Sequence, residues 1–253
     1  MDLGIRGQTA LVTGASRGLG RAIALALAAE GARVALGYRR ERAQAEEAAE
    51  ACRAAGAPAA MAHRLDASSE DDVGRFVDAA ARQLGPPTIL VNNGAVCPRG
   101  PATSVERAAW DEVLAVNLTG TFLLCRELLR RLGEARSPGR IVNVASTAAF
   151  HGSTSGQVAY DASKGGIVSL TISLAREAAP LAVTVNAIAP GLMLTDMMAE
   201  KYRADPERYL ARVPLRRLAA VEEVAAAAVF LASRQASYMT GTVVNVSGGL
   251  LMG

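Results

Sequence analysis

Short apolar runs rich in valine and isoleucine alternate with longer segments rich in alanine, leucine, glutamate and arginine along almost the whole chain of 253 residues. A continuous apolar run of this kind is typical of a strand that is covered on both faces of a sheet. Because helix-length segments separate the runs, we expect a parallel sheet wound through right-handed crossovers. The expected strands are 9–14, 33–38, 60–66, 88–93, 140–146, 183–189 and 242–246. The expected helices lie at about 18–30, 41–55, 69–84, 103–131, 157–179 and 221–233.

No linker, repeat or low-complexity tract divides the sequence. Hydrophobic residues make up 51% of the chain and charged residues 20%, which excludes a disordered protein and supports one sizeable core. We therefore predict a single α/β domain over residues 1–253, with a doubly wound seven-stranded parallel sheet and helices on both faces. Residues 191–214 interrupt the alternation of apolar runs and helix-length segments, and they follow the end of a predicted strand. We expect them to form a lid over a ligand site.

The polar composition restricts the classes of partner. Three cysteines (Cys52, Cys97 and Cys125) form no C-x-x-C pair, which argues against a disulfide framework and for a reducing compartment. The two histidines, His63 and His151, are too far apart in sequence to predict a metal site. A net charge of +3 does not indicate a nucleic-acid partner. Without a signal peptide or a long apolar run, we expect a cytoplasmic protein that does not span a membrane.

The sequence GASRGLG occupies residues 14–20, between the first predicted strand and the first predicted helix. Gly14 permits a tight turn, Gly18 leaves room for a pyrophosphate to approach the backbone, and Gly20 lets the helix pack on the strand. The start of the helix adds free N–H groups for an anion. We therefore predict a dinucleotide site here, whose residues are Gly14, Ser16, Arg17, Gly18, Leu19 and Gly20.

The same residues satisfy G-x-S-x-G, the nucleophile motif of α/β-hydrolases. That interpretation requires earlier strands that build an oxyanion loop, followed by an aspartate and a histidine downstream. No strand is expected before the one that leads into this loop, and the only late histidine is His151. The hydrolase interpretation is therefore the weaker one.

The end of the second predicted strand indicates which dinucleotide is preferred. An acidic residue there binds the ribose 2′-hydroxyl of NAD, whereas arginine accommodates the 2′-phosphate of NADP. The strand ends in Tyr38-Arg39-Arg40, without an acidic residue. Arg39, Arg40 and Arg17 from the glycine loop can pair with a phosphate by parallel hydrogen bonds, so NADP(H) is favoured over NAD(H). Arg40 is alternatively a solvated charge at the start of a helix.

Tyr160 and Lys164 stand four residues apart in a predicted helix, which places them on one face one turn apart. An ammonium at about 4 Å can lower the pKa of a phenol from about 10 to about 7, where it becomes an effective acid–base group. Ser146 ends the strand predicted before this helix. Its hydroxyl can hold a carbonyl oxygen beside the phenol.

Together these motifs resemble the short-chain dehydrogenase/reductase family, which has a Rossmann fold, over nearly the whole chain. Residues 13–20 match the cofactor loop of the family, and Ser146, Tyr160 and Lys164 match its catalytic triad. Asn117 matches the asparagine that extends the triad to a proton-relay tetrad. Tyr160 and Lys164 are also expected to touch the cofactor. The other cofactor contacts that the resemblance implies are Asp66, Ala67, Asn93, Gly94, Pro190, Gly191 and Thr195.

The C-terminal residues 238–249 resemble the branch of 3-oxoacyl-carrier-protein reductases. The resemblance implies hydride transfer between a nicotinamide and a ketone or secondary alcohol, a 3-oxoacyl thioester or similar carbonyl as substrate, and a homotetramer. An acyl carrier protein is a possible partner, for which the basic cluster Arg126, Arg130, Arg131, Arg136 and Arg140 offers a surface; a solvated helix end is the simpler interpretation. Two alternatives remain: a sugar, polyol or steroid dehydrogenase on the same scaffold, with NAD as its alternative cofactor, and a non-catalytic dinucleotide sensor.

One motif departs from the family pattern. The expected Asn-Asn-Ala-Gly after the fourth strand is here Asn92-Asn93-Gly94-Ala95. If the last position requires a positive φ, Ala95 would cost about 1 kcal/mol in backbone strain.

Overall fold

Seven parallel strands form one sheet in the order β3-β2-β1-β4-β5-β6-β7. The computed structural model describes residues 2–153, 156–195, 199 and 202–252. The strands are β1 (Thr9–Thr13), β2 (Arg33–Tyr38), β3 (Ala60–Arg64), β4 (Pro87–Asn92), β5 (Gly139–Val144), β6 (Val183–Pro190) and β7 (Val243–Val246). The predicted seven-stranded, doubly wound architecture is confirmed. The strand order reverses beside β1 and β4, and ligands bind at such a reversal, outside the carboxyl ends of the strands.

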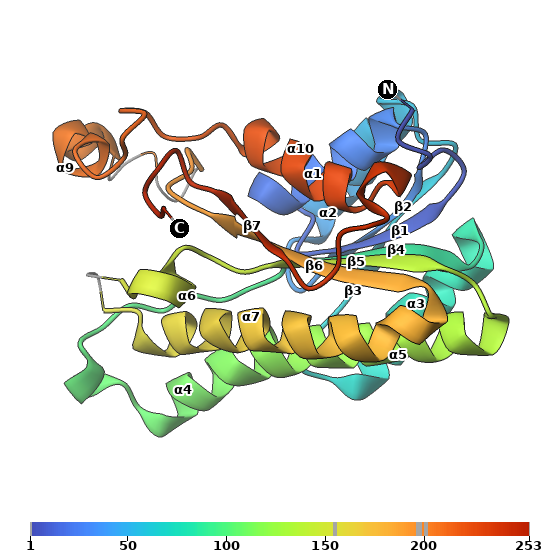
Figure 1. Ribbon diagram of the computed structural model, residues 1–253, viewed down its shortest axis with the longest axis horizontal. Helices are drawn as coiled ribbons and strands as arrows, with labels where there is room; N and C mark the ends of the chain where they lie inside the picture. Colours follow the sequence, from blue (N-terminus) through green and yellow to red (C-terminus); the bar gives the residue numbers. More distant parts are fainter. Residues whose placement is uncertain (1, 154–155, 196–198, 200–201, 253) are drawn as a thin grey trace.

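Helices cover both faces of the sheet (Figure 1). One layer contains α1 (Gly18–Ala29), α2 (Arg42–Ala54) and α10 (Val221–Leu231). The opposite layer contains α3 (Glu70–Leu84), α4 (Arg107–Leu114), α5 (Gly120–Ala135) and α7 (Val158–Ala178). Two short helices, α6 (Ala148–His151) and α9 (Pro206–Leu210), follow β5 and β6 in the chain. Among the described residues, no helix is both long and apolar enough to cross a membrane.

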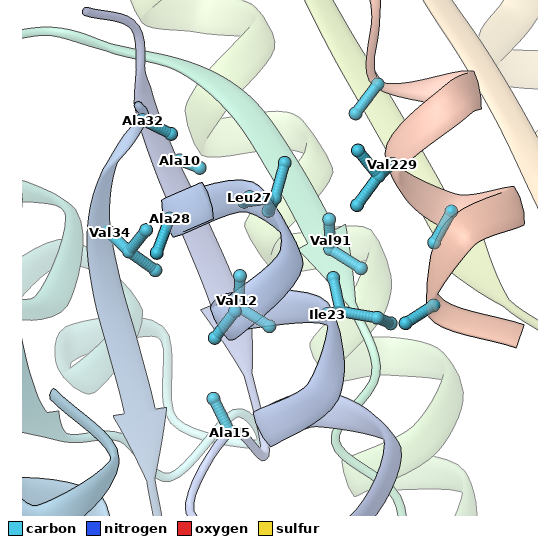
Figure 2. Packing of buried hydrophobic residues seen from close by; sticks show 14 of the residues in the cluster. Ala10, Val12, Ala15, Ile23, Leu27, Ala28, Ala32, Val34, Val91 and Val229 are labelled. Atoms are coloured by element: carbon cyan, nitrogen blue, oxygen red, sulfur yellow. The ribbon is translucent and has the colours of Figure 1, made fainter. Parts of the chain in front are cut away.

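The sheet separates two hydrophobic clusters, and neighbouring residues of each strand enter different ones. Val12 of β1 packs in the same cluster as Ile23 of α1 and Val229 of α10 (Figure 2). Leu11 belongs instead to the cluster that contains Phe76 of α3. Because both faces are buried, the strands lack polar alternation, which explains the continuous apolar runs of the sequence.

The predicted helix 103–131 is wrong in its interior. The structure has a 3₁₀ turn (Ala102–Ser104), then α4, then a π-helical turn (Ala115–Thr119), which continues directly into α5. A π-helical turn widens the backbone by one residue, and such turns are frequent at functional sites. This one contains Asn117.

Two strand ends also differ from the prediction. Strand β3 ends at Arg64 and not at Asp66, and β5 ends at Val144, so that Ser146 lies beyond the strand. The predicted lid, residues 191–214, includes a single-residue bridge between Met193 and Ala219 and helix α9. Its residues 196–198 and 200–201 lie outside the described part.

Candidate active site

The glycine turn between β1 and α1 has the conformation that the sequence predicts. Gly14 and Gly18 have φ angles of +61° and +55°, in the left-handed region that favours glycine. A Cβ on Gly14 would lie 2.7 Å from the Cα of Gly94, whereas a Cβ on Gly18 would meet no atom within 4 Å. Gly20 packs against the carbonyl of Gly14. The turn therefore packs tightly on one side and is open at Gly18.

A cleft of about 810 Å³ opens at the carboxyl ends of β1, β2 and β4. A volume of this size is typical of small-molecule and cofactor sites. Eleven of the predicted cofactor residues line it: Gly14, Ser16, Arg17, Gly18, Leu19, Arg39, Arg40, Ala67, Asn93, Gly94 and Thr195. Six others lie outside this lining: Gly20, Asp66, Tyr160, Lys164, Pro190 and Gly191. Gly191 instead packs on Ser247, and Pro190 accepts a hydrogen bond from the amide of Thr147 at 3.1 Å.

The turns after β1 and β4 are joined by hydrogen bonds. Thr13 Oγ1 accepts from the amides of Asn93 and Gly94 at 3.0 and 2.9 Å. Asn93 Nδ2 donates to the carbonyls of Thr13 and Gly14 at 3.1 and 3.2 Å. Asn93 thus braces the floor of the cleft.

The expected strain at Ala95 is absent. Among the described residues, the non-glycine residues with positive φ are Arg136, Ala182 and Arg216. The turn meets Gly14 one position earlier, at Gly94, where a Cβ would lie 3.3 Å from Thr13 Oγ1. The exchanged motif therefore fits the structure without backbone strain.

Arg39 is held by two carboxylates. Its Nε lies 3.4 Å from Asp66 Oδ2, and its Nη1 lies 3.1 Å from Glu112 Oε1 of α4. The Asp66 carboxyl accepts hydrogen bonds from Ser68, which, with the nearby arginines, hold its pKa below the usual range. Arg39 is thus paired with carboxylates, while Arg17 and Arg40 are exposed along the same cleft.

Tyr160 and Lys164 lie close together on α7, as their spacing predicts. Lys164 Nζ is 5.4 Å from the centroid of the Tyr160 ring and donates to the carbonyl of Val144, at the end of β5, at 2.6 Å. A buried hydrogen bond from Asn143 of β5 to Thr171 Oγ1, 3.0 Å long, fixes α7 to the same strand. Ser146 follows β5 and hydrogen-bonds the Tyr160 side chain. The three predicted side chains are therefore brought together.

The pKa values of this pair differ from the prediction. Burial raises the pKa of Tyr160 to about 12, although the hydrogen bond with Ser146 acts in the opposite direction. Burial also lowers the pKa of Lys164 to about 8. Desolvation disfavours every charged form, so it outweighs the attraction between phenolate and ammonium on which the prediction relied. At neutral pH the phenol therefore keeps its proton.

The amino-acid sequence is similar to those of known proteins. A family model described as enoyl-(acyl carrier protein) reductase matches residues 14–251. A 3-oxoacyl-(acyl-carrier-protein) reductase of Pseudomonas aeruginosa is 40% identical over 250 residues, covering 99% of this chain and 100% of the relative. The chain belongs to the short-chain dehydrogenase/reductase family.

Other members of this family are about as similar. A 3β-hydroxysteroid dehydrogenase of Eggerthella lenta is 40% identical over 255 residues, covering 98% of this chain and 95% of the relative. A solved structure from Agrobacterium tumefaciens, assigned as a 2-deoxy-D-gluconate 3-dehydrogenase with bound NADP, has a TM-score of 0.89 and 37% identity. It covers 98% of each chain. Similarity alone thus establishes an oxidoreductase family that binds nicotinamide cofactors and leaves the substrate open.

The residues present fit such a cofactor. The open face of Gly18 and the first turn of α1 offer backbone N–H groups to a pyrophosphate. Val113 and Val116 line the same cleft and offer an apolar surface to a base. The cleft and its backbone donors therefore suit a dinucleotide in size and chemistry.

The buried Asn117 side chain hydrogen-bonds to two other parts of the chain. Its Oδ1 accepts from the amide of Val96 at 2.8 Å, and its Nδ2 donates to the Val96 carbonyl at 2.9 Å and to Ser163 Oγ at 3.1 Å. The buried side chain therefore clamps the loop after β4 to α7. The π-helical turn places the side chain where it reaches both.

Several residues that line the cleft were not predicted. They are Thr13, Gly37, Tyr38, Glu41, Leu65, Ala95, Val96, Cys97, Pro98, Glu112, Val113, Val116 and Met193. A sequence pattern marks three of them: at helical spacing, Asn117 is preceded by Glu112, Val113 and Val116. The others follow from the sheet topology, which brings the ends of β2, β3 and β4 together.

The arginines of the predicted basic cluster do not form one surface of unpaired charges. On α5, Arg126 pairs with Glu70, while Arg130 and Arg131 pair with Glu127 and other carboxylates. Arg136 ends α5 in a left-handed conformation, and Arg140 lies at the start of β5. The cluster therefore gives no support to a docking surface for an acyl carrier protein.

Proposed function

We propose that this chain is an NADP(H)-dependent reductase of a carbonyl substrate, with a 3-oxoacyl thioester as its substrate class. The observation that carries the proposal is the grouping of Ser146, Tyr160 and Lys164. Cys97, which lines the dinucleotide cleft, acts electrostatically on both Tyr160 and Lys164 and links the group to the cleft. The cofactor, when bound, supplies the hydride from nicotinamide C4. The protein supplies the proton and the geometry.

In the reducing direction, Ser146 Oγ and the Tyr160 hydroxyl donate hydrogen bonds to the substrate carbonyl oxygen. As negative charge develops on that oxygen, Tyr160 transfers its proton to it. A phenol whose pKa is raised to about 12 is protonated before this step, as a proton donor must be. Lys164, one helical turn away, stabilises the phenolate that remains and contacts the nicotinamide ribose.

Asn117 acts in this proposal as a positioning residue. Its clamp on Val96 fixes the cleft wall, and its bond to Ser163 ties that wall to the helix of Tyr160. Residues 191–214 act as the lid, in which Met193 and Thr195 face the cofactor cleft.

NADP(H) selection rests on Arg17, Arg39 and Arg40, whose positions along the cleft suit a 2′-phosphate. The NADP-bound structural relative agrees with this preference. The paired state of Arg39 implies an exchange, in which the phosphate replaces Glu112 as the anion at its guanidinium.

The 3-oxoacyl thioester is favoured by the Pseudomonas aeruginosa relative, whose match spans its whole length. An acyl carrier protein would then carry the substrate. A homotetramer is the assembly proposed, and the exposed Phe122 of α5 and Ile172 of α7 offer apolar contact surface for it. Light scattering of the purified chain tests the assembly directly.

A 3β-hydroxysteroid dehydrogenase is the second candidate, because the Eggerthella lenta relative has the same sequence identity to this chain, 40%, as the Pseudomonas aeruginosa relative. The test compares kcat/KM for several substrates at matched concentrations. For NADPH oxidation with an acetoacetyl thioester, kcat/KM should be higher by about a hundredfold or more than for 3β-hydroxysteroids or 2-deoxy-D-gluconate with NADP or NAD. Faster turnover of the steroid would replace the thioester assignment. No turnover of any ketone or alcohol in the panel would contradict the catalytic proposal.

A further inference from the structure

A second cavity lies at the opposite edge of the sheet from the candidate active site. It has a volume of about 730 Å³ and is lined by the starts of four strands together with the segment after α10. We call it the amino-edge pocket; its lining is Gly7, Gln8, Thr9, Arg33, Pro86, Thr88, Ser137, Pro138, Gly139, Arg140, Ala232, Arg234 and Ser237. A strand of five residues spans about 17 Å, so the pocket is separate from the cleft.

The charges of the amino-edge pocket are of one sign. Arg33 comes from β2, Arg140 from β5 and Arg234 from the 3₁₀ turn Arg234–Ala236, and no aspartate or glutamate is among the described lining residues. Within the described part of the chain, none of the three forms an ion pair. This contrasts with Arg39, which is neutralised by two carboxylates.

Arg140 has a buried hydrogen-bond donor without a partner. Its Nε is inaccessible to solvent and bonds to no described atom, whereas its Nη1 donates to the carbonyl of Gly139 at 2.8 Å. Burial and the charge of Arg234 lower the pKa of Arg140. This Nε is too deeply buried for an anion to reach, but the like charges that face one cavity are costly unless an anion joins them.

The other two arginines are held in place by their surroundings. Arg33 Nη1 donates to the carbonyl of Leu84 at 3.2 Å, and Thr9 Oγ1 donates to the same oxygen at 2.9 Å. The stem of Arg234 lies against Gly4, where any side chain would collide with it. Each guanidinium therefore keeps free N–H groups while its stem is fixed.

We propose that the amino-edge pocket is an anion site for an organic diphosphate. Guanidinium groups pair with phosphate oxygens through parallel hydrogen bonds, and three of them match the charge of a diphosphate better than that of a single carboxylate. The cavity is larger than a diphosphate group alone, which leaves space for an organic portion among the neutral side chains of Thr88, Ser137 and Ser237.

Titration of the full-length chain with inorganic pyrophosphate, followed by calorimetry at constant ionic strength, tests the proposal. We expect Kd of about 1 mM or below in the wild type. Arg140→Gln and Arg234→Gln should each weaken binding by about ten- to a hundredfold, because a hydrogen bond to a charged group is lost. Arg176→Gln removes the same charge from the exposed surface of α7 and should leave Kd within twofold.

Arg17→Gln separates this site from the candidate active site, whose glycine turn contains Arg17 and is also expected to accept a pyrophosphate. Loss of binding in Arg17→Gln, with unchanged binding in Arg234→Gln, would place the anion in the cofactor cleft and overturn the proposal. Equal losses in Arg176→Gln and Arg234→Gln would show a general charge effect and would also overturn it. Since Arg234 is exposed, its variant remains informative if Arg140→Gln does not fold.

Discussion

The two ends of the candidate active site use charge in opposite ways. Around Tyr160 and Lys164 the side chains are buried, and desolvation moves both groups toward their neutral forms. Around Arg39 the charges are partly exposed and cancel in ion pairs with Asp66 and Glu112. The first arrangement suits proton transfer, because a small local change decides where the proton lies. The second suits recognition, because one anion can replace another at little cost.

This comparison predicts that substitutions at the buried end change rates, whereas substitutions at the exposed end change cofactor affinity.

The largest effect among these predictions is expected for Lys164→Met. Removing the ammonium leaves the developing phenolate without its counter-charge, so kcat for NADPH-dependent reduction should fall by about 10²- to 10⁴-fold. Steady-state kinetics measure the effect, and a thermal melt checks the fold, because Lys164 Nζ also bonds to Val144. A kcat within threefold of the wild type would break the proposed distinction between the two ends.

The pH dependence should report the same group. Because the pKa of Lys164 lies at about 8, the ammonium is present below that pH and is lost above it. Reduction should therefore slow as pH rises through 8, by about tenfold for each further unit. The profile of kcat from pH 6 to 9.5 in the wild type shows this descent. In Lys164→Met the residual rate should not show it.

At the exposed end, Arg39→Ala should raise KM for NADPH by about tenfold and change KM for NADH by less than twofold. Glu112→Gln should act in the opposite direction and lower KM for NADPH several-fold, because it releases the guanidinium. Arg42→Ala, which removes an exposed arginine paired with Glu46, is the matched control. Equal changes for both cofactors in Arg39→Ala would remove the case for phosphate recognition.

The smallest effect on rate is expected for Asn117→Ala, which removes the clamp on Val96. The part-buried amide and carbonyl of Val96 lose their partner, so the free energy of unfolding should fall by about 1–3 kcal/mol and kcat by a few-fold. Asn245→Ala, at an exposed asparagine, should change stability by less than about 0.5 kcal/mol. Denaturant unfolding and steady-state kinetics measure the two effects. A large loss of kcat with unchanged stability would indicate a direct chemical role.

The sequence predicted the fold well because its signals are local and repeated. Apolar runs buried on both faces and a glycine turn after the first strand define the sheet without knowledge of distant contacts. The spacing of Tyr160 and Lys164 likewise defines a helix face, and the structure confirms their proximity.

The remaining differences depend on long-range contacts. The pairing of Arg39 with Glu112 joins residues 73 positions apart, and no local pattern indicates it. The π-helical turn at Asn117 follows from contacts with Val96 and Ser163 on other elements. The pKa of Tyr160 could not be obtained from its neighbour alone, because burial depends on the whole site. The sequence therefore does not determine the charge balance or the dielectric environment of the candidate active site.

The role of Tyr160 as proton donor is measured most directly by Tyr160→Phe, in a single turnover of bound NADPH with an acetoacetyl thioester. We predict hydride transfer about 10³-fold slower than in the wild type, with Kd for NADPH within twofold when measured by fluorescence. Hydride transfer within tenfold of the wild-type rate would contradict the assignment of this hydroxyl as the proton donor.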